Sequence, residues 1–177
     1  MDRYDVYLGL GSNLGDRRAN ITAAIAHLKQ HVAVERMSSI YETEPAYVLD
    51  QPRFYNAVLQ GQTHLAPRSL LDFVKRIEQD LGRTATLRYG PRRIDIDILA
   101  CGAMQVNDPD LTIPHPLIAE RAFVLVPWAE IAPNLVLPSQ QCSIAELAAQ
   151  VDGAGSIVRV LTEYSLIKFD NQQRSPP

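Results

Sequence analysis

Residues 93–99 read Arg93-Ile94-Asp95-Ile96-Asp97-Ile98-Leu99, a strict alternation of polar and apolar side chains. This period of two is typical of a β-strand that buries one face, because successive side chains point to opposite faces of a sheet. Asp95 and Asp97 therefore share a face, with Cα atoms about 6.6–6.8 Å apart. Two carboxylates this close repel each other, which indicates a cationic group between them.

The segments before this strand alternate between strand and helix patterns. We expect strands over residues 5–10, 32–41 and 54–63, and helices over residues 17–30 and 67–81. Asp16 should cap the first helix, and Pro67 and Gly82 should begin and end the second. The order strand, helix, strand, strand, helix, strand predicts the βαββαβ arrangement of ferredoxin-like α/β (α+β) folds. In that arrangement helices pack on one face of an antiparallel-rich sheet.

The remaining segments are shorter. Residues 42–53 contain two prolines and no periodicity, which predicts a long loop of a kind that is often functional. Residues 107–116 form a proline-punctuated connection, and residues 119–128 a helical segment. A helix over residues 143–151 should begin with a capping box of Ser143 and Glu146, and an edge strand should follow at residues 157–161. We expect one domain over residues 1–165 and a flexible C-terminal tail over residues 166–177.

Composition narrows the class of protein. The 177 residues are 46% hydrophobic and 21% charged, as in an average globular protein. The net charge of −3 argues against nucleic-acid binding, and no apolar run approaches the roughly 20 residues of a membrane span. The N-terminus lacks a secretory signal pattern, and Cys101 and Cys142 have no metal-site spacing. We expect a cytoplasmic monomer that binds neither nucleic acid nor membranes.

Basic residues cluster just before the aspartate strand. Arg83, Arg88, Arg92 and Arg93 fall within eleven positions, and guanidinium groups bind phosphate oxygens in bidentate pairs. Mg²⁺ suits the neighbouring aspartates, because it takes one or two carboxylates and completes its shell with water and phosphate oxygens. The alternative is a solvated arginine loop beside an exposed strand face.

Three further features are candidates for ligand contacts. His115 stands between two prolines and could donate to a phosphate, with Arg121 six residues later; the alternative is a structural histidine. Phe54, Asn56 and Phe123 suit a flat heteroaromatic ligand, because aromatic faces stack on rings and an amide both donates and accepts. The alternative places both phenylalanines in the core. The glycines of residues 9–15 are one residue too widely spaced for a dinucleotide motif and predict a structural turn.

Taken together, the sequence resembles the 6-hydroxymethyl-7,8-dihydropterin pyrophosphokinase family of folate biosynthesis from about Tyr4 to Pro138. The most specific segments are Gly90-Pro91-Arg92-Arg93-Ile94-Asp95-Ile96-Asp97 and Pro114-His115-Pro116 with Glu120-Arg121-Ala122-Phe123. Further matches are Gly9-Leu10-Gly11-Ser12-Asn13-Leu14-Gly15-Asp16, Tyr41-Glu42-Thr43-Glu44-Pro45, Asp50-Gln51-Pro52, Arg76-Ile77-Glu78 and Gly82-Arg83.

The resemblance implies transfer of pyrophosphate from ATP to the pterin hydroxymethyl oxygen, with release of AMP. It implies two Mg²⁺ ions held by Asp95 and Asp97, which with Arg92 form the catalytic set. The implied ATP-site residues are Glu78, Arg83, Arg92, Ile98, His115 and Arg121, and the arginine cluster adds Arg88 to the expected ATP site. The implied pterin-site residues are Thr43, Glu44, Phe54, Asn56, Asp95 and Phe123. The chain departs from the family pattern at Ala46-Tyr47-Val48-Leu49, Lys75, Ala85 and Tyr89.

Two other functions fit parts of the pattern. A non-catalytic, ferredoxin-like module that senses a metabolite would have the same fold. An ordinary ATP-dependent small-molecule kinase would release ADP instead of AMP. The aspartate pair beside phosphate-type residues favours the pyrophosphokinase, because a sensor has no need of it. The sequence offers no compelling general base.

Overall fold

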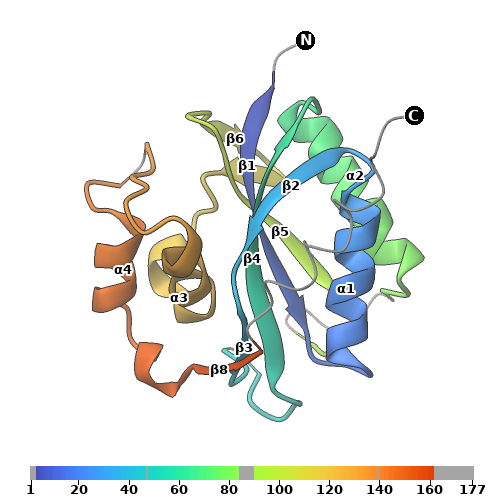
Figure 1. Cartoon of the computed structure of the whole chain (residues 1–177), viewed down its shortest axis with the longest axis vertical. Helices are drawn as coiled ribbons and strands as arrows, with labels where there is room; N and C mark the ends of the chain where they lie inside the picture. Colours follow the sequence, from blue (N-terminus) through green and yellow to red (C-terminus); the bar gives the residue numbers. More distant parts are fainter. Residues whose placement is uncertain (1–2, 47, 84–89, 139, 162–177) are drawn as a thin grey trace, which may run out of the picture.

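A six-stranded antiparallel sheet forms the centre of the molecule (Figure 1). The computed structural model describes residues 3–46, 48–83, 90–138 and 140–161. The strands of this sheet are β1 (Tyr4–Ser12), β2 (Val32–Met37), β3 (Ile40–Thr43), β4 (Phe54–Thr63), β5 (Asp95–Cys101) and β8 (Val158–Leu161). Their order is β5-β1-β4-β3-β8, and β2 also pairs with β4. The strand β8 therefore lies at an edge, as predicted.

The strands β2 and β3 both pair with β4, one after the other along its length, so together they fill one position in the sheet. With that pair counted as one strand, the order in the sheet is the ferredoxin-like one. The predicted single strand over residues 32–41 is divided at Ser38 and Ser39. The backbone N–H of Ser38 donates to the Val58 carbonyl, and the Val58 N–H donates to the Ser38 hydroxyl, both at 2.9 Å. A side chain thus takes the place of one backbone acceptor, and the strand breaks there.

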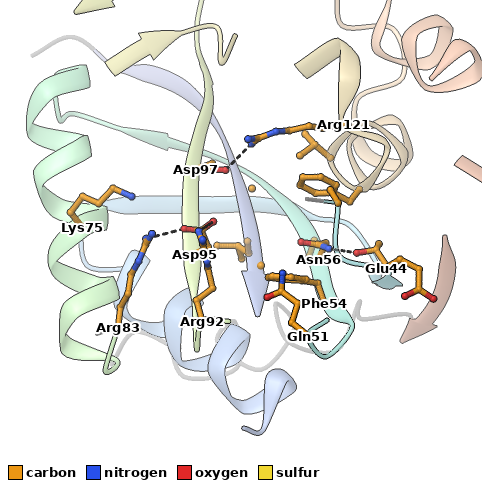
Figure 2. Close-up of a pocket in the computed structure, with 18 residues that line it drawn as sticks. Glu44, Gln51, Phe54, Asn56, Lys75, Arg83, Arg92, Asp95, Asp97 and Arg121 are labelled. Carbon is orange, nitrogen blue, oxygen red and sulfur yellow. Dashed lines mark hydrogen bonds and ion pairs between the residues drawn. The ribbon is translucent and has the colours of Figure 1, made fainter. Parts of the chain in front are cut away.

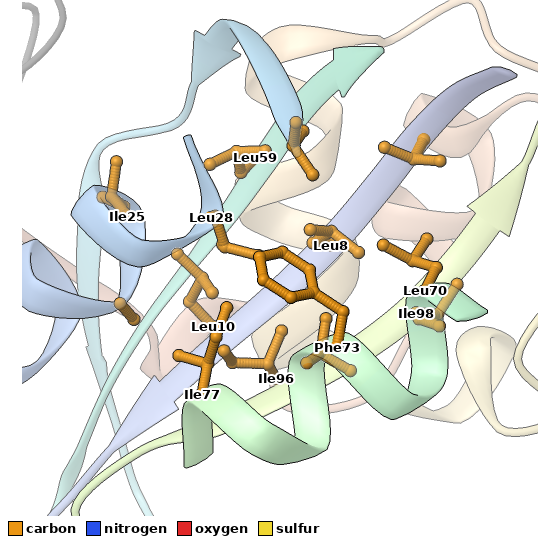
Figure 3. Close-up of a cluster of buried hydrophobic side chains, with 14 of the residues drawn as sticks. Leu8, Leu10, Ile25, Leu28, Leu59, Leu70, Phe73, Ile77, Ile96 and Ile98 are labelled. Atoms are coloured by element: carbon orange, nitrogen blue, oxygen red, sulfur yellow. The ribbon is translucent and has the colours of Figure 1, made fainter. Parts of the chain in front are cut away.

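The helices α1 (Arg17–Leu28) and α2 (Pro67–Asp80) cover one face of the sheet (Figure 1). The side chain of Asp16 accepts from the Ala19 N–H at 2.9 Å, so the predicted cap is confirmed. Buried side chains of both helices meet the inward face of the strands (Figure 3). The helices contribute Leu28, Leu70, Phe73 and Ile77, and the strands contribute Leu8, Leu10, Ile96 and Ile98.

The opposite face of the sheet is covered as well, by α3 (Ala122–Ile131) and α4 (Ile144–Gln150) (Figure 1). The expectation that helices pack on one face only was therefore wrong. The second face presents Val58, Leu99 and Ala100, and the fully buried Trp128 of α3 packs there. Apolar side chains on both faces of a sheet require a cover on both sides. This second layer brings Arg121, which directly precedes α3, within 3.2 Å of Asp97 on β5.

The rest of the chain forms small elements. The segment predicted as a proline-punctuated connection contains a hairpin of β6 (Val106–Asp108) and β7 (Leu111–Ile113). Two 3₁₀ turns, η1 (Ile118–Glu120) and η2 (Ala154–Ser156), flank the second helical layer. The capping box of Ser143 and Glu146 is confirmed. Within the described ranges, no helix is long and apolar enough to cross a bilayer. The predicted tail over residues 166–177 lies outside the described residues.

Candidate active site

One cleft gathers ten of the fourteen predicted site residues (Figure 2). These ten are Thr43, Glu44, Phe54, Asn56, Arg83, Arg92, Asp95, Asp97, Arg121 and Phe123. The cleft lies where β1, β4 and β5 meet the start of α3 and the end of α2, so residues far apart in sequence converge there. Arg88, a predicted ATP-site residue, lies outside the described residues, as do Tyr47, Ala85 and Tyr89.

The aspartate pair faces this cleft from β5, as its alternation predicts (Figure 2). Asp95 pairs with Arg83 at 2.9 Å and with Arg92 at 2.8 Å. Asp97 accepts from Arg121 at 3.2 Å. Cationic groups therefore offset the two carboxylates, as expected, and in this structure they are guanidinium groups.

The environment of Asp97 disfavours its charge. Burial, followed by the neighbouring Asp95 carboxylate, raises the pKa of Asp97 to about 6 despite the opposing effect of Arg121. A divalent cation would reverse this effect by favouring two ionised carboxylates. No third His, Cys, Asp or Glu completes a metal cluster within the described ranges. The pair therefore fits Mg²⁺, which accepts two carboxylates and takes its other ligands from water and phosphate.

Glu78 lies beneath the cleft rather than in its lining. Its side chain is 1% exposed and accepts from the backbone N–H of Ile96 at 2.7 Å. It also forms an ion pair with Arg83, and Lys75 donates to it at 3.1 Å. Burial raises the pKa of Glu78, and the two cations oppose this shift. Glu78 thus fixes Arg83 and Lys75 at the rim of the cleft.

Ile98 is a predicted ATP-site residue whose side chain does not face the cleft. Its side chain is in the core under α2, on the opposite face of β5 from the aspartates (Figure 3). A direct contact between this side chain and a nucleotide has no support in its placement, and its role stays a prediction.

His115 and Arg121 adjoin each other beside Asp97. The Nδ1 atom of His115 accepts from the Leu117 N–H at 3.2 Å, and its Nε2 lies 3.4 Å from Arg121. Burial, followed by Arg121, lowers the pKa of His115 to about 4. In the neutral ring one nitrogen accepts and the other donates, and the 3.2 Å contact with the Leu117 N–H favours Nδ1 as the acceptor. Arg121 is 8% exposed, and its buried Nε has no hydrogen-bond partner among the described residues. An anion would satisfy that group.

The other end of the cleft suits a flat polar ring. The Asn56 amide donates to the Thr43 hydroxyl at 2.7 Å, and both residues are buried. Phe54 and Phe123 line the cleft and are half-buried, so neither is a fully enclosed core residue. A Cβ at Gly11 would lie 3.0 Å from Oδ1 of the Asn56 side chain. The glycine therefore leaves room for this amide.

Sequence reasoning did not assign several lining residues. Gln51 and Gly11 line the cleft although neither stood in a predicted site. Both lie in segments that carry the family resemblance, and this resemblance could have identified them as site residues. Lys75 also lines the cleft, at a position where the chain departs from the family pattern.

Known proteins resemble this chain over most of its length. The family model of 7,8-dihydro-6-hydroxymethylpterin-pyrophosphokinase (HPPK) matches residues 7–133. The chain belongs to this family. The Methylorubrum extorquens 2-amino-4-hydroxy-6-hydroxymethyldihydropteridine pyrophosphokinase is 45% identical over 151 residues, which cover 84% of this chain and 94% of that HPPK.

Other relatives are longer proteins. A folic acid synthesis protein of Dictyostelium discoideum is 41% identical over 86% of this chain and 23% of its own length. The mitochondrial folate synthesis bifunctional protein of Pisum sativum is 40% identical over 98% of this chain and 34% of its own. The chain thus spans a quarter to a third of these relatives. A solved HPPK-DHPS in complex with substrates has the same fold, with a TM-score of 0.72 at 14% identity over 84% of this chain and 43% of that one.

Proposed function

We propose that this HPPK-family protein transfers pyrophosphate from ATP to the hydroxymethyl group of 6-hydroxymethyl-7,8-dihydropterin in folate biosynthesis and releases AMP. The observation that carries this proposal is the shared cleft. It places the Asp95 and Asp97 carboxylates and three arginines beside a buried amide and two half-buried phenylalanines, and Arg121 lies over the Phe123 ring at 5.6 Å. An anionic phosphate chain and a flat heteroaromatic alcohol are the two ligands that such a cleft suits.

Each group has a role in this reaction. The pterin hydroxymethyl oxygen gives up its proton to solvent and forms a bond to the β-phosphorus of ATP. The bond from that phosphorus to the oxygen that leaves with AMP breaks. Arg83, Arg92 and Arg121 bind phosphate oxygens and offset the charge that grows on the leaving AMP. Asn56 and Thr43 hold the polar edge of the pterin while Phe54 and Phe123 contact its ring. Alignment of attacking and leaving oxygens supplies much of the rate, and no residue is assigned as a general base.

Mg²⁺ would bind at Asp95 and Asp97, where it would neutralise phosphate charge during the transfer. We propose two such ions with ATP. We also propose a cytoplasmic monomer whose single catalytic domain spans residues 1–165, with no nucleic-acid or membrane partner. The mildly acidic net charge of −3 supports the absence of a nucleic-acid partner.

The decisive experiment identifies the nucleotide product. The protein is incubated with Mg²⁺, ATP and 6-hydroxymethyl-7,8-dihydropterin, and nucleotides are separated over time. We expect AMP in step with pyrophosphorylated pterin, and no product from an Asp95→Asn variant. ADP as the product would indicate an ordinary kinase. Ligand binding without turnover would indicate the metabolite-sensing module.

A further inference from the structure

The turn between β1 and α1 carries a buried asparagine that contacts two separate loops. Asn13 is 2% exposed. Its Oδ1 accepts from the backbone N–H of Arg92 at 2.8 Å. Its Nδ2 donates to the Gln51 side chain at 3.1 Å and to the Pro52 carbonyl at 3.0 Å. The backbone N–H of Asn13 also donates to the Arg92 carbonyl at 3.1 Å. One residue thus joins the loop before β4 to the loop before β5.

These partners fix the orientation of the amide. A backbone N–H can pair only with Oδ1 and a backbone carbonyl only with Nδ2, so the group cannot flip without losing bonds at both ends. The turn is held independently, because the Asn20 amide donates to the Ser12 hydroxyl at 3.1 Å and to the Leu14 carbonyl at 2.8 Å. Asn13 is therefore a fixed point to which both loops attach.

Each attached loop reaches a different part of the cleft. Gln51 lines the cleft and lies beside Phe54 in Figure 2, on the side that suits the pterin. Arg92 forms an ion pair with Asp95 at 2.8 Å, on the side that suits phosphate and Mg²⁺. A continuous series of contacts therefore runs from Gln51 through Asn13 and Arg92 to Asp95.

We propose that Asn13 is a positioning residue that couples pterin binding to nucleotide binding; the inference rests on the proposed function. A pterin that orders Gln51 and Pro52 also fixes Asn13, which in turn fixes the backbone of Arg92 for the phosphates. The ligand that binds second then has less of the site to order, and this is positive coupling. Coupling of this kind is reciprocal, so each ligand tightens the other by the same factor.

The test measures pterin affinity by calorimetry, with and without Mg²⁺ and a non-hydrolysable ATP analogue. In the parent protein the analogue should raise pterin affinity by a factor of about 5–150. In Asn13→Ala that factor should fall toward unity, while each ligand alone still binds. Asn20→Ala is the matched control, because it removes hydrogen bonds within the same turn and none to either loop. In this variant the analogue should raise pterin affinity as much as in the parent protein. A residue that only supported the fold would not change this factor selectively.

Thermal melts accompany each titration. Asn13→Asp keeps an acceptor for Arg92 but loses the donors to Gln51 and Pro52, so it should lose coupling like Asn13→Ala even if the alanine variant unfolds. If either variant folds and the ATP analogue still raises its pterin affinity as much as in the parent protein, the proposal is overturned. A parent protein that makes AMP but shows no coupling would also overturn it. Unfolding of both variants would assign Asn13 to the fold alone and overturn it too. A parent protein that makes no AMP refutes the proposed function instead.

Discussion

Replacing Asp97 by asparagine should stabilise the free protein at neutral pH while abolishing turnover. Burial and the nearby Asp95 carboxylate raise the pKa of Asp97 to about 6 in the fold, against about 3.9 for an unfolded aspartate. Between these two values the folded protein holds a proton that the unfolded chain releases, so stability falls as the pH rises through this range. Asparagine keeps the shape of the side chain but carries no charge, so the variant does not lose this stability as the pH rises.

The size of the gain follows from the shift and the exposure of the side chain. A pKa difference of about two between the folded and the unfolded state corresponds to about 3 kcal/mol of stability lost above both values. The Asp97 side chain is 32% exposed, so water screens its charge, and the variant also gives up the 3.2 Å ion pair with Arg121. We therefore expect a net gain of about 1 kcal/mol, or a melting temperature higher by about 2–4 °C.

Melting curves of the parent and Asp97→Asn, recorded without nucleotide at several pH values, measure this effect. The difference should be absent near pH 4, grow toward about pH 6 and stay constant above it. Asp95→Asn is the control. It relieves part of the repulsion that raises the pKa of Asp97, but it also removes the partner of Arg83 at 2.9 Å and of Arg92 at 2.8 Å, so its net gain should be smaller. An Asp97→Asn variant that is less stable than the parent at pH 7, or a difference that does not vary with pH, would refute the reasoning.

Three further predictions address other parts of the molecule. Phe123→Ala should weaken pterin binding about 2–13-fold through lost stacking and leave nucleotide binding unchanged; titration of each ligand beside a melt separates this from a core defect. Because burial lowers the pKa of His115 to about 4, its ring NMR resonances should not titrate between about pH 5.5 and 8; a midpoint near the ordinary value would show that water reaches the ring. In Gly61→Ala the new Cβ would lie 2.7 Å from the Ala33 carbonyl, so denaturant unfolding should reveal a loss of about 1–3 kcal/mol. Gly155→Ala, which meets no described atom within 4 Å, should leave stability unchanged.

Local patterns were sufficient to predict most of the first layer of the fold. The alternation around Asp95 and Asp97 correctly places both on one face, and the predicted cap at Asp16 and capping box at Ser143 are present. The division of the strand at Ser38 was not predictable, because it depends on a hydrogen bond to Val58, which is twenty residues away in the chain. Local periodicity carries no information on such a contact.

The second helical layer was harder to predict for a different reason. The α3 segment is apolar on almost every side and contains Pro127, so it has no single stripe that says which face of a sheet it covers. In the site, the buried charge of Glu78 depends on the Ile96 N–H and on two cations from other segments. A glutamate within a helix is typical of a solvated face, so its pattern alone did not indicate a buried position.

The ion pairs of the cleft have a consequence for how binding should respond to ionic strength. Arg83 and Arg92 already share Asp95, and Arg121 already holds Asp97. Under the proposed function, a nucleotide takes over guanidinium groups that the carboxylates release to Mg²⁺, so it does not meet three free cations. Such an exchange of partners alters the local charge far less than capture by a solvated arginine loop, whose attraction added salt would screen. Nucleotide affinity should therefore depend weakly on salt, because binding replaces existing ion pairs and does not fill an uncompensated positive patch.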